Sequence, residues 1–391
     1  MSFLCNNCKK KIFNSHKIYK PMGTQRELSV YVCPNCSLVQ SFPRIDKVLK
    51  RKVNVSSGAD WGNIRYGKGF RSKFAISIIE KYKKLTYFSK VLDLGSSRGS
   101  FLDDFYKKND KALFVGVEPD VNLKKNYSSK LHIKLINNRI ENIELKDSFF
   151  DLVHCSHTLE HLSDPISVLF KIYKALKPNG LMFLEVPNIN CITNQNLFEE
   201  FFIDKHLYHY SEKTLEDALF KTNFKVIKKY IDNDNLAYLV SREESSQEKN
   251  NFQCIESVNS IKKDILSYLK NLKKVRQAYV EVSRYIKSHL PKKIVFWGSG
   301  RIFDLLLKNG DLKTGDIHGL IDSNLYKYID KMHGIEIQSP ASLSKLRPDI
   351  IVIASRTFFD EIKKSILAQT DRSVKIFGII DLIENSSIFK K

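Results

Sequence analysis

The hydrophobic positions of the chain predict short buried strands that alternate with amphipathic helices. Apolar positions recur at helical spacing over residues 71–82, and residues 90–94 then form a short strand that ends at a glycine. The strand-like runs up to about residue 240 are VLDLG, FVGVEP, LHIKLIN, DLVHCS, GLMFLEVPN, FKVIKKYI and LAYLVSR. This alternation predicts a mostly parallel sheet with helices on both faces.

A second alternation of strands and helices follows a long amphipathic helix. Residues 242–254 are polar and aperiodic, which predicts a linker, and apolar positions then step by three or four over residues 258–286. Pro291 closes this helix, for which packing between domains is the favoured role. The later strand-like runs are residues 294–297, 318–322, 349–353 and 374–378.

We therefore expect an α/β protein with a small zinc-binding module and two Rossmann-like domains. The expected segments are a module over residues 1–50, a first Rossmann-like domain over 51–242, a linker and helix over 243–290, and a smaller Rossmann-like domain over 291–391. Within the first domain, residues 52–70 are rich in glycine, serine and aromatic residues, and we interpret them as a loop over a site.

Four of the seven cysteines form two Cys-x2-Cys pairs, Cys5 with Cys8 and Cys33 with Cys36, separated by 24 residues. Four thiolates at this spacing can close a tetrahedral Zn²⁺ site that leaves no open position for chemistry. Structural zinc is thus the favoured interpretation, with unrelated or redox-active cysteine pairs as the alternative. The other three cysteines, Cys155, Cys191 and Cys254, are isolated and are expected to be unreactive.

The chain has 391 residues and a formal net charge of +21. Its lysines lie in short scattered groups without interleaved aromatic residues, so we expect a small anionic substrate rather than a nucleic acid. No apolar run approaches the ~18 to 20 residues of a membrane span, and the first residues lack the apolar region of a secretion signal. We therefore expect a cytoplasmic protein without a membrane span; its oligomeric state is not predicted.

The segment DLGSSRG at residues 93–99 follows a predicted strand and opens a helix. Glycines at this turn allow a ligand to approach the backbone closely. Glu118 ends the next strand about 20 residues later, where an acidic side chain can accept hydrogen bonds from both hydroxyls of a ribose. A nucleoside ligand fits this combination, whereas the loop lacks the glycine spacing of a dinucleotide fingerprint.

Four motifs in order, VLDLGSSRG, VGVEPD, FFDLVHCSHTLEHLSDP and ALKPNGLMFLEVPN, resemble those of class I S-adenosylmethionine-dependent methyltransferases. The resemblance covers about residues 90–190 and implies that S-adenosylmethionine is the cofactor. It implies that Asp93, Gly95 and Gly99 surround the methionine part and that Glu118 holds the ribose. It further implies that the segment Asn138-Arg139-Ile140 lies beside the adenine, and that residues 154–157, including His157, lie near the methyl group.

The order of a zinc knuckle, a methyltransferase domain, a long helix and a second Rossmann-like unit is similar to that of the sugar C-methyltransferases. This similarity implies a nucleotide-linked sugar as the acceptor, in surface polysaccharide or deoxysugar biosynthesis. That subfamily carries a Tyr-x-Glu-His segment where this chain has Ile203-Asp204-Lys205-His206, so the histidine alone is kept. Methylation at carbon and methylation at oxygen both stay open.

The run around His206 supplies the candidate catalytic residues. A histidine has a reference pKa near ~6.5, which suits it to take a proton at neutral pH. We predict that His206 is the base, that Tyr208 helps to orient it or the sugar, and that Lys205 stabilises an enolate or holds a phosphate or carboxylate. The alternative is that this run only packs a loop.

Three further alternatives remain from the sequence. Glu160 and His161, which we expect on a helix directly after the strand DLVHCS, can form an acid/base pair, although an architectural role is favoured. The Gly298-Ser299-Gly300 turn with Asp322 can cradle a phosphate, although a tight turn in a degenerate nucleotide fold is favoured. The chain as a whole can instead be a binding or assembly module on a degenerate methyltransferase fold, or a methyltransferase for a non-sugar acceptor.

Overall fold

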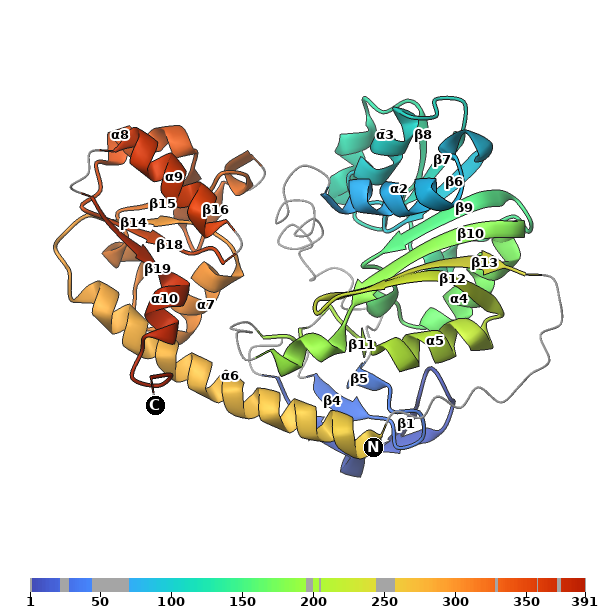
Figure 1. Cartoon of the computed structure of the whole chain (residues 1–391), viewed down its shortest axis with the longest axis horizontal. Coiled ribbons are helices and arrows are strands. Elements are labelled where there is room, and N and C mark those ends of the chain that lie inside the picture. The colour runs from blue at the N-terminus through green and yellow to red at the C-terminus, as the bar shows by residue number, and fades with distance from the viewer. Residues whose placement is uncertain are drawn as a thin grey trace. The chain divides into compact units, whose positions relative to one another are not determined.

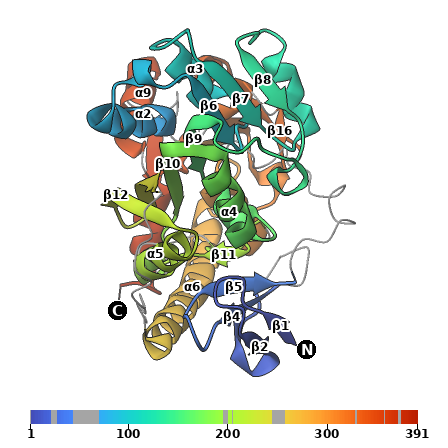
Figure 2. The same cartoon turned by 90° about the vertical axis from the view of Figure 1, so that its right-hand side faces the viewer.

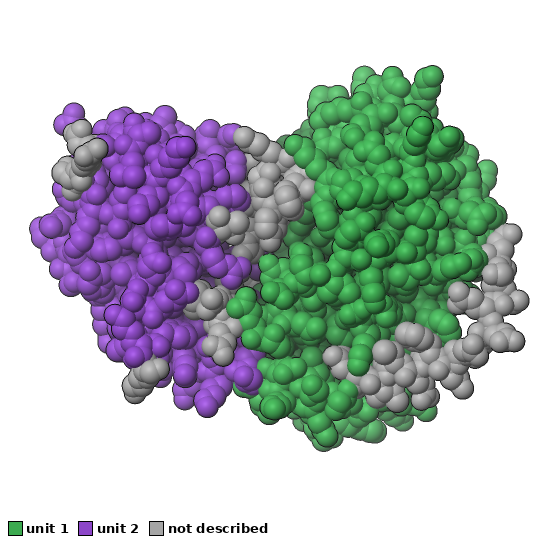
Figure 3. All heavy atoms as spheres, in the orientation of Figure 1, with its two compact units in different colours: residues 1–194, 201–266 green, residues 195–200, 267–391 purple. Residues whose placement is uncertain are grey.

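The computed structural model describes residues 2–21, 28–43, 70–194, 200–203, 205–243, 257–327, 330–356, 358–370 and 374–390. Residues 52–69 of the loop predicted at 52–70, most of the predicted linker and Cys254 lie outside these residues, and Phe70 begins helix α2 (Phe70–Tyr82). The chain divides into two compact units (Figure 3). Unit 1 comprises residues 1–194 and 201–266, and unit 2 comprises residues 195–200 and 267–391.

Unit 1 is built on a seven-stranded sheet of order β12-β13-β10-β9-β6-β7-β8 (Figure 1). The strands β6, β7, β8, β9 and β10 run parallel, and β12 and β13 add an antiparallel edge. Their bounds are β6 Lys90–Leu94, β7 Leu113–Val117, β8 Ile133–Ile136, β9 Phe150–Ser156, β10 Leu176–Pro187, β12 Phe224–Ile231 and β13 Asn235–Arg242. The predicted Rossmann-like, mostly parallel sheet is confirmed.

Helices cover both faces of this sheet (Figure 2). Successive strand residues point to opposite faces, so Val91 packs with α2 (Phe70–Tyr82) and α3 (Ser100–Tyr106), whereas Leu92 packs with α4 (Pro165–Ala175) and α5 (Glu212–Lys221). A helix layer on each face leaves the carboxyl ends of the parallel strands as the edge where a ligand binds.

The N-terminal segment of unit 1 forms small antiparallel sheets. Strand β1 (Ser2–Leu4) pairs with β2 (Lys11–Phe13), and β3 (Lys17–Tyr19), β4 (Ser29–Val32) and β5 (Val39–Phe42) form a second sheet. Strand β11 (Tyr208–His209) joins this second sheet by pairing with β5. The N-terminal segment is thus hydrogen-bonded to the loop that carries the predicted catalytic run.

Unit 2 contains a six-stranded sheet of order β16-β17-β15-β14-β18-β19, in which all neighbours except β16 and β17 are parallel. Its strands are β14 Ile294–Trp297, β15 Gly319–Ile321, β16 Lys331–Met332, β17 Ile335–Gln338, β18 Ile350–Ile353 and β19 Lys375–Gly378. Its helices are α7 Arg301–Asn309, α8 Leu343–Leu346, α9 Phe359–Gln369 and α10 Ile379–Glu384.

The long predicted helix is confirmed as α6 (Val258–Lys287), which begins in unit 1 and ends in unit 2. Its inward positions, such as Ile265, Leu272 and Tyr279, are buried at the helical spacing seen in the sequence. Among the residues that the structure describes, no helix is both long and apolar enough to cross a membrane.

Candidate active site

The loop between β6 and α3 adopts backbone conformations that require glycine at two positions. Gly95 has φ +69° and Gly99 has φ +78°, both in the left-handed region that L side chains rarely adopt. A Cβ on Gly95 would also lie 2.2 Å from the Thr158 Oγ1. The loop therefore packs directly against the segment that follows β9.

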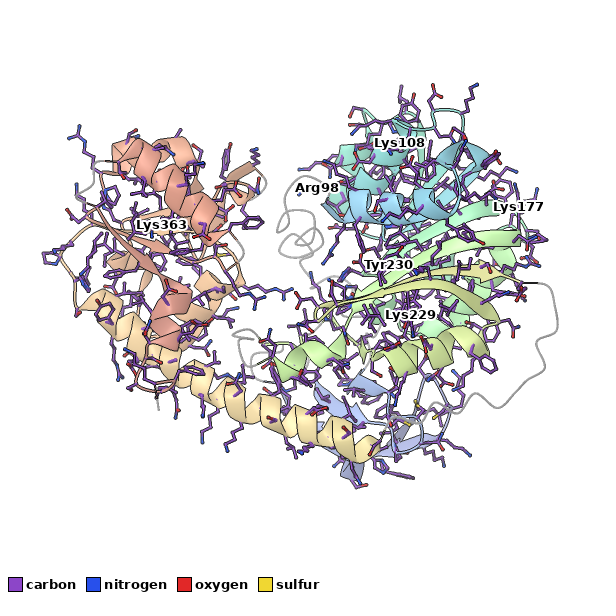
Figure 4. All side chains as sticks on the ribbon, viewed as in Figure 1. Arg98, Lys108, Lys177, Lys229, Tyr230 and Lys363 are labelled. Carbon is purple, nitrogen blue, oxygen red and sulfur yellow. The ribbon has the colours of Figure 1, made fainter. Side chains whose placement is uncertain are left out.

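Tyr127 fixes the loop between β6 and α3 through hydrogen bonds of its hydroxyl. Its hydroxyl donates to the Ser97 carbonyl oxygen at 2.9 Å and lies 2.8 Å from the Ser96 Oγ. Lys130 donates to the carbonyl oxygen of Arg98, which is labelled on this loop in Figure 4. The loop is thus fixed by the protein's own contacts.

Glu118 directly follows β7 and faces the same loop. Its Oε2 accepts a hydrogen bond from the Ser97 backbone N–H at 2.8 Å, and its Oε1 accepts one from the Asp120 N–H at 2.8 Å. Burial raises the pKa of Glu118 to about 7, although both backbone hydrogen bonds act to lower it. Each carboxylate oxygen keeps a second lone pair for a ligand hydroxyl.

The fit to S-adenosylmethionine can be tested at this loop. The Ser97 Oγ is buried and has no hydrogen-bond partner within the described part of the chain. An unsatisfied hydroxyl beside an acidic side chain with spare lone pairs is a suitable environment for a ribose. The residues present therefore fit the nucleoside part of this cofactor.

Asp93 and His154 form a buried pair between β6 and β9. The Asp93 Oδ1 lies 2.6 Å from the His154 Nδ1, and the His154 ring stacks between Phe101 and Phe183. His154 is thus a core residue that orients Asp93, at one end of the segment predicted to lie near the methyl group. The predicted adenine neighbour Asn138 is exposed, and its side chain accepts from the Arg139 N–H.

The segment after β9 was expected to be a helix, and the structure corrects this. Residues Leu159–His161 form a 3₁₀ turn, and α4 begins only at Pro165 behind the Asp164 N-cap. His157 has φ +48°, a conformation uncommon for residues other than glycine and often found at functional sites. Thr158 donates to the Leu94 carbonyl oxygen at 3.0 Å, which ties this segment to the loop between β6 and α3, hereafter the cofactor loop after its predicted ligand.

Glu160 lies at the centre of a histidine cluster and is only 1% exposed. Its Oε1 is 3.5 Å from the His157 Nδ1 and 3.6 Å from the His161 Nε2. Burial alone would raise the pKa of Glu160, but the neighbouring His161 and His157 imidazoles outweigh it and lower the pKa below its usual range. The two imidazoles are thus the main electrostatic partners of this buried carboxyl group.

His161 links this cluster to the predicted catalytic run. Its Nδ1 lies 2.7 Å from the Lys205 carbonyl oxygen; since a carbonyl can only accept, the Nδ1–H is the donor of this hydrogen bond. The rings of His161 and His206 are 5.0 Å apart. The structure thus brings together the predicted base His206 and the Glu160–His161 pair, which no spacing in the sequence connects.

Tyr208 and the adjacent His209 are buried in the loop, whereas Lys205 is partly exposed. Tyr208 is 1% exposed and donates from its hydroxyl to the Ser163 carbonyl oxygen. His209 shares a hydrogen bond with the Ser41 Oγ at 3.0 Å, and burial lowers its pKa to about 3. The described contacts of Tyr208 are structural, so its orienting role stays a prediction, as does that of Lys205.

The four predicted zinc ligands converge in the N-terminal segment. The Sγ atoms of Cys5, Cys8, Cys33 and Cys36 all lie within 4.8 Å of one another, with Cys5 to Cys36 at 3.6 Å and Cys8 to Cys33 at 3.5 Å. Zn–S bonds of ~2.3 Å place tetrahedral sulfur atoms ~3.8 Å apart, so the cluster has the dimensions of a zinc site.

The two cysteine pairs also share one backbone turn. In the first, the Lys9 N–H donates to the Cys5 carbonyl oxygen, and in the second, the Ser37 N–H donates to that of Cys33. Lys9 and Ser37 both have positive φ, at 59° and 61°. The two halves of the cysteine cluster therefore have the same local backbone geometry.

Next to the glycine turn of unit 2 lies Asp322, whose carboxylate oxygens already accept hydrogen bonds from the protein. Asp322 Oδ2 accepts from the Ser299 N–H and Oγ, and its Oδ1 accepts from the Asn324 and Leu325 N–H groups. A Cβ on Gly298, which has φ +110°, would lie 2.9 Å from the Ala354 carbonyl oxygen. This geometry favours the tight-turn interpretation over a phosphate site.

Residues 68–229 match the family described as methyltransferase domain, and residues 290–385 match the family described as C2185-like, N-terminal. A curated relative, the tRNA U34 carboxymethyltransferase of Sulfurimonas denitrificans, is 28% identical over 123 residues, which are 30% of this chain. The chain spans 40% of the length of that relative. The methyltransferase domain predicted from the four motifs is confirmed.

Solved methyltransferase structures match part of this chain at low identity and low TM-score. The 1,6-didemethyltoxoflavin-N1-methyltransferase of Burkholderia thailandensis, solved with 1,6-didemethyltoxoflavin and S-adenosylhomocysteine, is 14% identical with a TM-score of 0.41, covering 58% of this chain and all of its own. A putative S-adenosylmethionine-dependent methyltransferase from Listeria monocytogenes is 16% identical with a TM-score of 0.36, covering 44% of this chain and all of its own. These likenesses concern the fold alone.

Proposed function

Because residues 68–229 form an S-adenosylmethionine-dependent methyltransferase domain, we propose that the chain methylates a nucleotide-linked sugar. One observation carries the acceptor side of this proposal. The cluster of Glu160, His157, His161 and His206 lies next to the cofactor loop, where an acceptor must lose a proton. The resemblance to the sugar C-methyltransferases and the net charge of +21 support an anionic sugar as substrate.

The cofactor would be held along the carboxyl edge of the sheet. Glu118 accepts from the ribose hydroxyls, Asp93, Gly95 and Gly99 surround the methionine part, Asn138 lies beside the adenine, and His157 lies towards the methyl group. When bound, S-adenosylmethionine supplies an electrophilic methyl group on a sulfonium.

The chain's own residues prepare the acceptor. His206 takes the proton of a hydroxyl for oxygen methylation, or of a carbon beside a ketone for carbon methylation. Lys205 holds an anionic group of the acceptor or stabilises an enolate. Methylation at oxygen and methylation at carbon differ in the acceptor atom that loses the proton, and His206 and Lys205 can take part in both reactions.

The four cysteines hold a structural zinc ion in this proposal. Four thiolates fill a tetrahedral site, so the ion has no position for the acceptor. Its role is to fix the turn around Cys33 and Cys36, which leads into β5. Because β5 pairs with β11, zinc also supports the loop that carries His206.

A nucleic-acid acceptor is the second candidate, favoured by one specific observation. The curated relative that matches part of this chain is a tRNA U34 carboxymethyltransferase. A chain with net charge +21 is compatible with a polyanionic acceptor.

The deciding experiment offers both acceptor classes to the purified chain with S-adenosylmethionine carrying a labelled methyl group. We expect mass spectrometry to find one added labelled methyl on a nucleotide sugar. Label found only in tRNA would replace the sugar proposal with the second candidate. Cofactor binding without transfer to either class would favour a binding module on a methyltransferase fold.

The role of His206 has its own test. His206→Ala should lower turnover by ~100-fold or more with S-adenosylmethionine affinity intact, the usual scale for loss of a general base. His289→Ala, a histidine substitution in unit 2, is the matched control and should keep normal turnover. Near-normal turnover of His206→Ala would reject the assignment, and solvent deuterium entering an acceptor carbon would decide for carbon methylation.

A further inference from the structure

Glu160 is a buried carboxyl group whose two oxygens make no hydrogen bond with the described residues. Its side chain is 1% exposed. Taking an ionised carboxylate out of water is costly unless it is paired, hydrogen-bonded or bound to a metal. The histidine nitrogens nearest to it, at 3.5 and 3.6 Å, are beyond good hydrogen-bond distance. The Glu160 oxygens therefore have room and free lone pairs for a bound ion or hydrogen-bond donor.

The side chains around this carboxylate are ligands of transition metals. One ligand atom each from Glu160, His161 and His206 lies within 4.8 Å of the others. Metal bonds of ~2.0 to 2.2 Å place neighbouring ligand atoms roughly 3 to 3.5 Å apart, so small side-chain rotations close the set on one ion. Two imidazoles and one carboxylate suit Fe²⁺, Mn²⁺, Co²⁺ or Zn²⁺ better than Mg²⁺ or Ca²⁺, which prefer oxygen ligands.

The hydrogen bond of His161 supports the same assignment. Its Nδ1–H donates to the Lys205 carbonyl oxygen, and this bond orients the ring so that Nε2 lies 3.6 Å from the Glu160 Oε1. Metal-bound histidines commonly donate their other ring N–H to a backbone carbonyl, because this contact fixes the tautomer and the ring orientation. This hydrogen bond also links His161 to Lys205, the residue directly before His206.

We propose that Glu160, His161 and His206 bind one divalent transition-metal ion, distinct from the zinc in the cysteine cluster. Three protein ligands leave at least one position open for an oxygen of another molecule. The Thr158 contacts with Leu94 and Gly95 place this ion beside the cofactor loop.

The function of the ion rests on the proposed methyltransferase activity. A metal lowers the pKa of an oxygen that it binds, so a coordinated sugar hydroxyl would lose its proton near neutral pH. The released proton passes to solvent water, and His206, as a ligand, positions the ion; without the ion His206 would take the proton directly. This arrangement favours methylation at oxygen, since a hydroxyl is the acceptor group that the ion activates.

Cobalt binding to the full-length chain tests the proposal without any acceptor. The protein is first loaded with zinc at the four cysteines, cleared of loosely bound metal by gel filtration, and then titrated with Co²⁺. We expect one further equivalent of Co²⁺ with d–d absorption bands and without the thiolate-to-cobalt charge-transfer band of cysteine ligation. His161→Ala and His206→Ala should lose this equivalent, and the isosteric Glu160→Gln should weaken it by at least tenfold.

Two controls keep this result interpretable. His289→Ala should bind the further equivalent as the unmodified chain does, and calorimetric S-adenosylmethionine affinity confirms that each variant is folded. The proposal is overturned if the unmodified chain takes up no further Co²⁺, or if the three ligand variants keep it. Cobalt uptake as expected, with no methyl transfer to any sugar, would instead reject the proposed acceptor and leave the metal site standing.

Discussion

Two acidic residues occupy equivalent positions in the two units, but they differ in the number of hydrogen bonds that they accept. Glu118 and Asp322 each follow a second strand and accept a hydrogen bond from the backbone N–H of the preceding glycine loop. Asp322 accepts four hydrogen bonds, two on each oxygen, whereas each oxygen of Glu118 accepts one from the backbone. Glu118 therefore has capacity for ribose hydroxyls that Asp322 lacks.

Glu118→Ala should weaken S-adenosylmethionine binding by at least ~100-fold. The substitution removes the acceptor for two ribose hydroxyls, and a hydrogen bond to a charged group contributes ~1.5 to 3 kcal/mol. Calorimetry on the variant measures the loss, with Asp322→Ala as the matched carboxylate control in unit 2. Loss of binding in Asp322→Ala with normal binding in Glu118→Ala would assign the cofactor to unit 2.

The pKa of Glu118 predicts how cofactor affinity depends on pH. Burial raises this pKa to about 7 in the protein without cofactor, so the carboxylate is increasingly protonated as the pH falls below 7. If only the ionised form accepts both hydroxyls, the affinity should fall about tenfold between pH 8 and pH 6. Calorimetric titrations at pH 6, 7 and 8 measure this change, and Glu118→Gln should remove it.

The same shift has an opposite consequence for folding. Because the folded protein binds this proton more tightly than the unfolded chain, the contribution of Glu118 to stability decreases as the pH rises from about 4.5 to about 7. Cofactor affinity and this part of the stability therefore change in opposite directions over that window. A pH slope of affinity that is equal in the unmodified chain and in Glu118→Gln would show that another group controls binding.

At the scale of elements, the N-terminal segment is attached to the methyltransferase domain at several points. The first cysteine turn contacts the helices, since the Asn6 side chain donates to Asp164, the N-cap of α4, and Asn7 donates to Asp217 of α5. The second turn leads into β5, which pairs with β11. Loss of the zinc ion proposed for the cysteine cluster should therefore disturb both helices and the loop that carries the predicted catalytic run.

Cys33→Ser should lower the melting temperature and the zinc content of the chain together. Zinc binding to small modules is coupled to their folding, with apparent free energies of ~10 to 16 kcal/mol in isolated peptides. Elemental analysis and a thermal melt measure both quantities, with Cys191→Ser, a cysteine outside the cluster, as the control. Protein purified without chelators that contains no zinc, or an unchanged melt for Cys33→Ser, would contradict the prediction.

Elements with a clear hydrophobic period were predictable from the sequence. Strand β6 and helix α6 fall within one or two residues of their predicted bounds, because burial on one face or both dictates their composition. The 3₁₀ turn at Glu160 and the two-residue strand β11 were not, since elements this short have no period. The convergence of Glu160, His161 and His206 depends on tertiary packing across 45 residues of sequence, which no local pattern records.

At the scale of the whole molecule, the positive charge is spread over many elements and partly neutralised there. Three lysines labelled in Figure 4 show this: Lys108 pairs with Glu80, Lys177 with Asp151, and Lys229 with Glu216. Exposed pairs of this kind contribute little to stability, but each cancels a charge that would otherwise attract a polyanion. The net charge of +21 therefore does not by itself identify a nucleic-acid surface.

The dependence of acceptor affinity on salt follows from this distribution and separates the two acceptor classes. A nucleotide sugar offers one diphosphate, so its binding should weaken less than about tenfold between 50 and 200 mM salt. A protein that neutralises six to ten phosphates of a nucleic acid loses ~10³ to 10⁵ in affinity over that range, because counterions are released on binding. Equilibrium binding of nucleotide sugars and of tRNA at several salt concentrations measures both slopes. We expect the shallow slope for the molecule that becomes methylated; a methylated acceptor with the steep slope would mean that the chain acts on nucleic acid.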